Sequence, residues 1–341
     1  MRPFIQVWVM TVAAAVMVIV NPAKGSFLRA QSPQLIATSK VRLTDESTGI
    51  DGIAQTLISV FDQADIVALG EDHGEQRDSD LRIALVRHPD FAKKVRFIVV
   101  EFGSASEQLT LDRYIQGENV SPSQLEQVWK STAAGRSGAW TSPIYADFFA
   151  AVRDVNSKLP AGAQIRVFGG DPGPAGNRSR DAAAVSLLKE QVLQKHGKAL
   201  VIYGLAHFAR IEGDARKVLG IGEGLVTLLE REYPGRTFVV MPIGRSSNGT
   251  PAIAGIRDPD YQKFDQALKT PLRPVLVSFE RSPFRDFTAE EFIGQKLLNC
   301  RGAVGCVSVF KDSTLTLGQM ADACVYFGGD VGVDTKTKPA R

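Results

Sequence analysis

The sequence predicts an α/β fold with a mostly parallel central sheet, helices on both of its faces and a helical insertion after the second strand. Short apolar runs rich in Val, Ile and Phe recur along the chain and alternate with segments of helical periodicity. The runs are apolar at consecutive positions, which is typical of strands covered on both faces. Strands that alternate with helices favour a parallel sheet with right-handed crossovers.

Seven runs have the length and composition of buried strands. In chain order they are DIVALGE (65–71), VRFIVVE (95–101), QIRVFGG (164–170), KALVIYG (198–204), RTFVVMP (236–242), RPVLVSF (273–279) and ACVYFGG (323–329). The predicted helices between them are 50–62, 78–88, 104–116, 142–158, 178–195 and 223–232. A further helix opens at Ser121, where Gln124 completes a capping box. Residues of about 105–160 form the insertion, which we expect to cap one sheet edge.

The bulk composition is that of an ordinary globular protein. The 341 residues are 44% hydrophobic and 23% charged, and the net charge of +3 gives no electrostatic case for nucleic acid. The length would allow two domains, but no boundary interrupts residues 49–330, which we predict to be a single hydrolase-like α/β domain. Residues 331–341 are expected to be a disordered tail.

The N-terminus has the pattern of a secretory signal peptide. Arg2 precedes an apolar run from Phe4 to Val20, and small residues follow, so residues 1–25 are predicted to be removed before Ser26. The alternative is an uncleaved N-terminal anchor, the predicted membrane contact. Residues 26–48 are interpreted as a linker with room for an edge strand. Both alternatives predict export to the periplasm or the extracellular space.

Three cysteines leave two interpretations open. Cys300 and Cys306 would close a small disulfide loop outside the cytoplasm, with Cys324 in an apolar strand. The alternative is that all three are reduced packing residues. Their spacing is not that of a zinc motif.

Polar side chains follow four of the predicted strands. Glu71 and His73 end the first, Glu101 ends the second, Asp171 follows the third and His207 follows the fourth. Ligands of open α/β sheets bind beyond the carboxyl ends of the strands, so we expect these groups to meet in one site. Alternation along an extended segment places Glu71 and His73 on the same side.

One spacing occurs twice. Gly70-x-x-His73 and Gly204-x-x-His207 both follow an apolar run directly. Glycine there lets the backbone turn tightly and keeps the space beside an imidazole open.

These residues carry a resemblance to a known superfamily. The segment 66–118, which begins IVALGEDHGEQ, resembles the opening of the superfamily that joins erythromycin esterases, ChaN-like haem-binding proteins and Tiki (TraB-type) metallopeptidases. IRVFGGDP, VIYGLAHF and MADACVYFG resemble its later strand ends, so the likeness covers roughly 60–330. The single residue between Glu71 and His73 is closer to the ChaN-like spacing than to that of the esterases, which usually have two.

The resemblance implies a hydrolase of esters or amides. In this hypothesis Glu71 orients His73, which acts as general base on water, and Glu101 and His207 complete the catalytic group. Asp171, Trp140 and Tyr145 are the candidates for contacts to a small-molecule substrate. The serine motif Gly-x-Ser-x-Gly is absent from the sequence.

Three alternatives stay open. His73, Glu101 and His207 could hold a divalent metal ion, which would make the hydrolysis metal-assisted. By resemblance to the ChaN-like branch, the chain could instead bind haem or a related cofactor, with His207 or Tyr203 as axial ligand. The third alternative is a scaffold that keeps the fold without activity.

Overall fold

The computed structural model describes residues 41–43, 46–138, 140–173, 179–210, 223–244, 265–268, 270–288, 298–299, 307–308 and 315–328. The predicted leader, most of the linker, Cys300, Cys306 and the tail lie outside these residues. Among the helices of the described residues, none is both long and apolar enough to cross a membrane.

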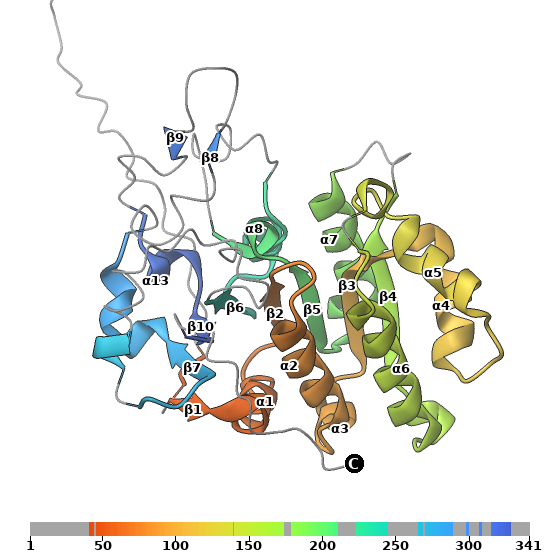
Figure 1. The fold of residues 1–341 in the computed structure, drawn as a ribbon, viewed down its shortest axis with the longest axis horizontal. Coiled ribbons are helices and arrows are strands. Elements are labelled where there is room, and N and C mark those ends of the chain that lie inside the picture. The colour runs from red at the N-terminus through yellow and green to blue at the C-terminus, as the bar shows by residue number, and fades with distance from the viewer. Residues whose placement is uncertain are drawn as a thin grey trace, which may run out of the picture. The chain divides into compact units, whose positions relative to one another are not determined.

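An eight-stranded sheet forms the centre of the protein, with the strand order β1-β7-β10-β6-β2-β5-β3-β4 (Figure 1). Its strands are β1 (Ser47–Thr48), β2 (Ile66–Glu71), β3 (Phe97–Ser104), β4 (Arg166–Asp171), β5 (Ala199–Gly204), β6 (Thr237–Ile243), β7 (Val275–Ser278) and β10 (Ala323–Tyr326). Each of the seven predicted strands is present within a few residues. The short strands β8 (Leu298–Asn299) and β9 (Val307–Ser308) pair separately.

The sheet is mixed, with one parallel block and an antiparallel margin. Strands β10, β6, β2, β5, β3 and β4 are parallel to their neighbours within this block. Strand β7 is antiparallel to both β10 and β1. The prediction of a mostly parallel sheet is confirmed. The reversed strand was not foreseen, because a run that is apolar on both faces looks the same in either direction.

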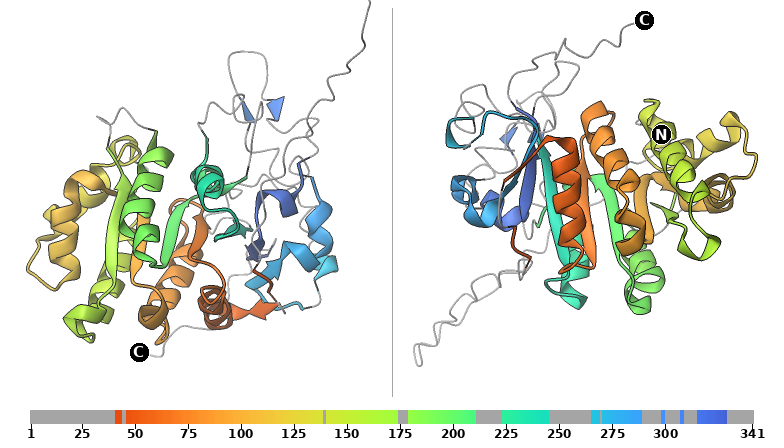
Figure 2. Two further views of the ribbon diagram at one scale, coloured as in Figure 1. Left: turned by 180° about the vertical axis from the view of Figure 1, so that it is seen from behind. Right: turned by 90° about the horizontal axis from the view of Figure 1, so that it is seen from below.

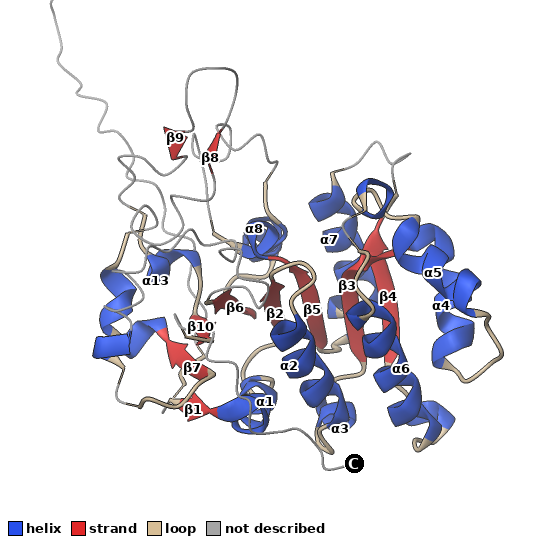
Figure 3. Cartoon of the chain, viewed as in Figure 1, coloured by secondary structure: helices blue, strands red, loops and turns tan. Residues whose placement is uncertain are grey.

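Helices cover both faces of the sheet (Figures 2 and 3). The α-helices of the described residues are α1 (Gly49–Val60), α2 (Gln76–Arg87), α3 (Phe91–Lys94), α4 (Gln108–Ile115), α5 (Pro122–Lys130), α6 (Ile144–Ser157), α7 (Arg180–Gln191), α8 (Leu205–Phe208), α10 (Leu225–Glu232) and α13 (Leu317–Met320). Helices α1, α2 and α6 share one apolar core with one set of strand residues. Helices α7 and α10 share a second apolar core with the strand residues that point to the opposite face of the sheet.

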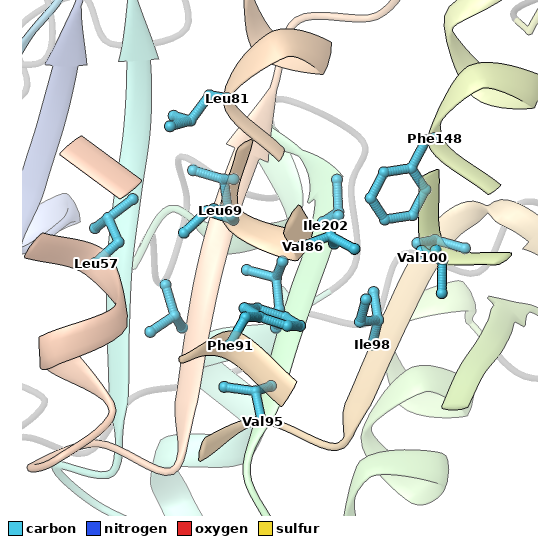
Figure 4. Close-up of a cluster of buried hydrophobic side chains, with 14 of the residues drawn as sticks. Leu57, Leu69, Leu81, Val86, Phe91, Val95, Ile98, Val100, Phe148 and Ile202 are labelled. Carbon is cyan, nitrogen blue, oxygen red and sulfur yellow. The ribbon is translucent and has the colours of Figure 1, made fainter. Parts of the chain in front are cut away.

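The first core shows how the period-two pattern of the strands fixes the layers. Leu69 of β2 and Ile202 of β5 point to the face where Phe148 of α6 and Leu81 of α2 are buried (Figure 4). Burying a side chain of this size contributes about 1.5–3 kcal/mol. The strand ends are therefore held at fixed positions by a packed interior.

The predicted insertion between β3 and β4 contains α4, α5 and α6. Helices α4 and α5 lie beside the β4 edge of the sheet, and α6 packs against α2 (Figure 1). The capping box at Ser121 and Gln124 is present. The loop before α6 brings Trp140 toward the carboxyl ends of the strands, where it contacts His73.

Candidate active site

The carboxyl ends of four neighbouring parallel strands bring the predicted polar groups together. Glu71 ends β2, Glu101 lies on β3, Asp171 ends β4, and His207 lies on α8 directly after β5. Three of the four catalytic candidates lie together, because His207 contacts Glu101, and the Glu101 carboxylate and the His73 ring both lie beside Gly204. The fourth, Glu71, joins this group through its bond to His73.

Glu71 and His73 form the pair that alternation predicted. Nδ1 of His73 donates to Oε1 of Glu71 at 3.0 Å, and an ionised carboxylate can only accept. This bond places the acceptor lone pair of the neutral imidazole on Nε2. Glu71 is 1% exposed, whereas the side chain of His73 is 35% exposed.

Arg82 is the buried partner of Glu71. Its guanidinium donates to Oε2 of Glu71, and both side chains are almost fully excluded from solvent. The guanidinium carbon lies 4.9 Å from the ring centroid of Phe102 and 5.3 Å from that of Tyr145. Aromatic faces stabilise a cation in this position, and the cation compensates the buried carboxylate.

Aromatic side chains of the insertion support the His73 loop. The rings of His73 and Trp140 meet edge to face at 4.4 Å between centroids. The Gly74 N–H donates to the hydroxyl of Tyr145 at 2.9 Å. Trp140 and Tyr145 are both buried, so the loop that carries His73 rests on packed aromatic side chains. Their predicted contact with substrate remains a prediction.

A buried carboxylate anchors the same loop from α2. The backbone N–H of Asp72 donates to Oδ2 of Asp78 at 2.7 Å. Burial, together with the nearby charges of Asp72 and Glu71, raises the pKa of Asp78 to about 7, although the bond to Asp72 and the charge of Arg77 lower it. The loop that carries His73 is thus held on two sides.

The pKa of His73 reflects opposing effects. Burial lowers the pKa, but the hydrogen bond to Glu71 and the charges of Glu71, Glu101 and Asp72 outweigh it and raise the pKa above 6.5. The surrounding carboxylates therefore favour the protonated imidazole more than water does.

Glu101 lies between the two histidine turns. Its Oε2 accepts the Gly204 N–H at 2.7 Å, and its Oε1 accepts from Arg180 at 2.7 Å and lies 3.3 Å from Nε2 of His207. Burial raises the pKa of Glu101, but the bond to His207, the charges of both histidines and the Gly204 N–H together lower it to about 2. Glu101 is therefore a permanent carboxylate at neutral pH.

His207 is clamped by two carboxylates. Nδ1 lies 2.7 Å from Oδ1 of Asp181, and Nε2 faces Glu101. Burial lowers the pKa of His207, but the bonds to Asp181 and Glu101 outweigh it and raise the pKa to about 9. At neutral pH His207 is thus an imidazolium ion.

Asp171 ties β4 to the insertion. Its Oδ1 accepts the backbone N–H groups of Ala133 at 3.1 Å and Gly173 at 2.7 Å. Burial is the main cause that raises its pKa. The side chain is 1% exposed, so this conformation gives it a positioning role, and its predicted contact with substrate remains a prediction.

The donor set of this conformation does not fit the two predicted cofactors. Both ring nitrogens of His207 face carboxylates, and among the described residues no group of three or more His, Cys, Asp or Glu side chains is arranged to hold a metal ion. The Tyr203 hydroxyl is fully buried beside Gly170, where a ligand bond to haem iron has no access.

Sequence reasoning missed Arg82, Arg180 and Asp181. Each begins or lies within a helix, away from the strand ends that drew attention to the other residues. A usable signal did exist for Arg82, because a charge within the otherwise apolar stretch LRIALV indicates a buried partner.

No established protein-family profile and no curated protein sequence matches this chain. Solved structures do. A Bacillus cereus protein, solved as structural-genomics target BcR135, is 13% identical and aligns over 82% of this chain and 91% of its own, with a TM-score of 0.55. A mutant of the erythromycin esterase EreC in its open conformation is 12% identical and aligns over 85% of this chain and 100% of its own, with a TM-score of 0.53.

The chain shares the fold of the Bacillus cereus protein and of the erythromycin esterase EreC. This confirms the predicted resemblance at the level of the fold. Haem-bound ChaN of Campylobacter jejuni is 14% identical and aligns over 55% of this chain and 85% of its own, and the TM-score of 0.34 is too low to bear on haem binding here.

Proposed function

We propose that the protein is an exported hydrolase that cleaves an ester or amide bond of a small molecule, with His73 as general base. The observation that carries this proposal is the bond between Nδ1 of His73 and a buried Glu71, which leaves Nε2 as the proton acceptor. A histidine oriented by a carboxylate is a recurrent arrangement for activating a nucleophile. The fold shared with an erythromycin esterase supports the same reaction class.

In the proposed reaction, Nε2 of His73 takes a proton from a water molecule. The resulting hydroxide attacks the carbonyl carbon, and a tetrahedral intermediate forms. The bond from carbon to the leaving oxygen or nitrogen then breaks, and the imidazolium of His73 returns its proton to the leaving group. Glu71 keeps its bonds to Arg82 and to Nδ1 of His73 throughout, so the imidazole stays oriented.

His207 has a different role in this proposal. With a pKa of about 9 it holds its proton at neutral pH, so it is a poor base and a fixed positive charge. Because both ring nitrogens face carboxylates, this charge holds Glu101 and Asp181 in place beside the base. Glu101 keeps this cation in place and separates the two imidazoles.

A hydrolase screen on the mature, metal-defined protein tests this proposal. Ester and amide substrates are compared for wild type and His73→Gln, before and after chelation. We expect activity that survives in the metal-free sample and is lost in the variant. His88→Gln is the matched control, because His88 contacts Gln55 away from the site. Unaltered activity in His73→Gln would rule out His73 as the base.

Export is a separate part of the proposal and rests on the predicted leader. N-terminal sequencing of the protein recovered from the cell envelope or medium is expected to begin at Ser26. An intact N-terminus in a membrane fraction would favour the anchor, and an intact N-terminus in the cytosol would contradict export.

A further inference from the structure

The charged groups of the site differ in what they present to an incoming molecule. The carboxylates of Glu71, Glu101 and Asp181 are at most 10% exposed. Two side chains of the described cluster reach solvent much further, namely His73 and Arg180, each 35% exposed. A ligand that enters the site therefore meets the His73 imidazole and the Arg180 guanidinium before it meets any of these three carboxylates.

The buried carboxylates are already neutralised. Arg82 is paired with Glu71, His207 with Asp181, and Arg180 with Glu101. These three cations balance three carboxylates, so protonation of His73 gives this group a net positive charge. Asp72 is the partly exposed acid beside this group, and its charge acts on His73.

Among the described residues, the hydrogen bond of Arg180 is to Glu101 and uses one nitrogen, Nη1, at 2.7 Å. A guanidinium has five N–H groups in a planar fork that matches the two oxygens of a carboxylate. Because Arg180 and His73 flank the same Glu101 side chain, a group bound by Arg180 would lie a short distance from the reacting bond.

We infer that Arg180 is a specificity-determining residue that binds a carboxylate of the substrate, so that the preferred substrates are short acyl esters or amides with an anionic end. This inference rests on the proposed function and names its substrate class. Its geometric basis is the half-exposed fork of Arg180 beside a group of compensated charges. A neutral substrate would leave that fork unused.

Matched esters test the inference in catalysis. The mono-para-nitrophenyl ester of glutaric acid and para-nitrophenyl pentanoate have the same chain length and differ in the terminal carboxylate. We expect wild-type kcat/KM to favour the glutarate ester by about tenfold to a hundredfold, the size expected for a hydrogen-bonded charged pair. Arg180→Gln should bring this ratio close to one, and Arg180→Lys should give an intermediate ratio. Arg113→Gln is the control, since Arg113 is an exposed arginine paired with Glu118 on the insertion.

Direct binding provides an independent measurement. Glutarate dianion is expected to raise the melting temperature of wild type and Arg113→Gln and to leave that of Arg180→Gln unchanged. Equal shifts in all three proteins, or no shift in wild type, would overturn the role of Arg180. If neither ester is hydrolysed while glutarate still binds through Arg180, the proposed hydrolase fails and the anion site stands. If both esters are cleaved at equal rates, the hydrolase stands and the specificity fails.

Discussion

The two Gly-x-x-His turns have the same spacing, but their histidines differ in exposure to solvent and in the number of carboxylates that they contact. His73 follows β2, is 35% exposed and has one carboxylate on Nδ1. His207 follows β5, is 14% exposed and has a carboxylate on each nitrogen. The two turns share a sequence pattern, but other helices and strands bring different side chains to each histidine.

In the proposed mechanism, this difference separates the general base, His73, from a fixed positive charge, His207. A second carboxylate stabilises the imidazolium further, so the pKa of His207 reaches about 9. For His73, Arg82 offsets part of the charge of Glu71, and the pKa is raised without Nε2 being blocked by a bonded acid. The side chains around each imidazole thus give two histidines of one site different pKa values.

The largest effect is expected from removing the base. His73→Gln should lower kcat by about 10²–10⁴-fold, the usual contribution of a general base. The folded state should change little in stability, because His73 is half-exposed and packs mainly against Trp140. Steady-state kinetics and thermal unfolding of the same samples provide the measurement. A variant that loses stability as much as activity would contradict the distinction between the two turns.

His207→Gln should have the opposite effect and lower the stability of the folded state more than the activity. A pKa raised from 6.5 to about 9 corresponds to about 3 kcal/mol of stabilisation. Because the folded-state pKa is the higher one, this contribution is complete below pH 6.5 and is lost as the pH rises through about 9.

Denaturant unfolding of wild type and His207→Gln across this pH range measures the effect. The difference between the two proteins should shrink as the pH rises. Asp78, whose pKa is raised to about 7, adds a pH dependence of its own, which the difference cancels. A difference that is independent of pH would show that His207 is not held as a cation.

Glu71→Gln should have an intermediate effect. Removing the charge lowers the pKa of His73, so the acid limb of the kcat/KM profile should move to lower pH. The rate at the optimum should fall about tenfold to a hundredfold, because the amide fixes the imidazole tautomer less firmly. Asp72→Asn is the graded control and should move the limb less, since Asp72 acts by charge alone. An unmoved limb in Glu71→Gln would assign the titration to another group.

The fold and the catalytic candidates were largely predictable, because both depend on local patterns. Apolar runs of strand length fix seven strands, and alternation places Glu71 beside His73. The direction of β7 was not predictable, since pairing partners distant in sequence decide it.

The compensating charges were the unpredictable part of the site. Asp181 and Arg180 come from the start of α7, and only the folded chain brings them to His207 and Glu101. Trp140 is buried against His73, and its predicted contact with substrate stays a prediction. Local sequence therefore identifies the strand-end residues of the site, while the packing of distant elements supplies the partners that set their charge states.

The smallest predicted effect tests whether the two turns depend on each other. A methyl group on Gly204 would lie 2.9 Å from Cε1 of His73 and 3.3 Å from Oε2 of Glu101. Because Gly204 has φ −54° and ψ 142°, alanine suits its backbone, and the expected effect is steric. Gly204→Ala should displace the His73 ring, lower kcat about tenfold and destabilise the fold by about 1–3 kcal/mol.

The control for this substitution is Gly52→Ala in α1. A methyl group there meets no atom within 4 Å, so the variant should gain roughly 0.5–1 kcal/mol of helix stability and keep full activity. If Gly204→Ala also keeps full activity, the glycine of the second turn does not make room for the histidine of the first. The informative result is a loss of activity in Gly204→Ala alone, with the stability still falling as the pH rises through about 9. This result would mean that Gly204 of the second turn provides the space that the His73 ring occupies.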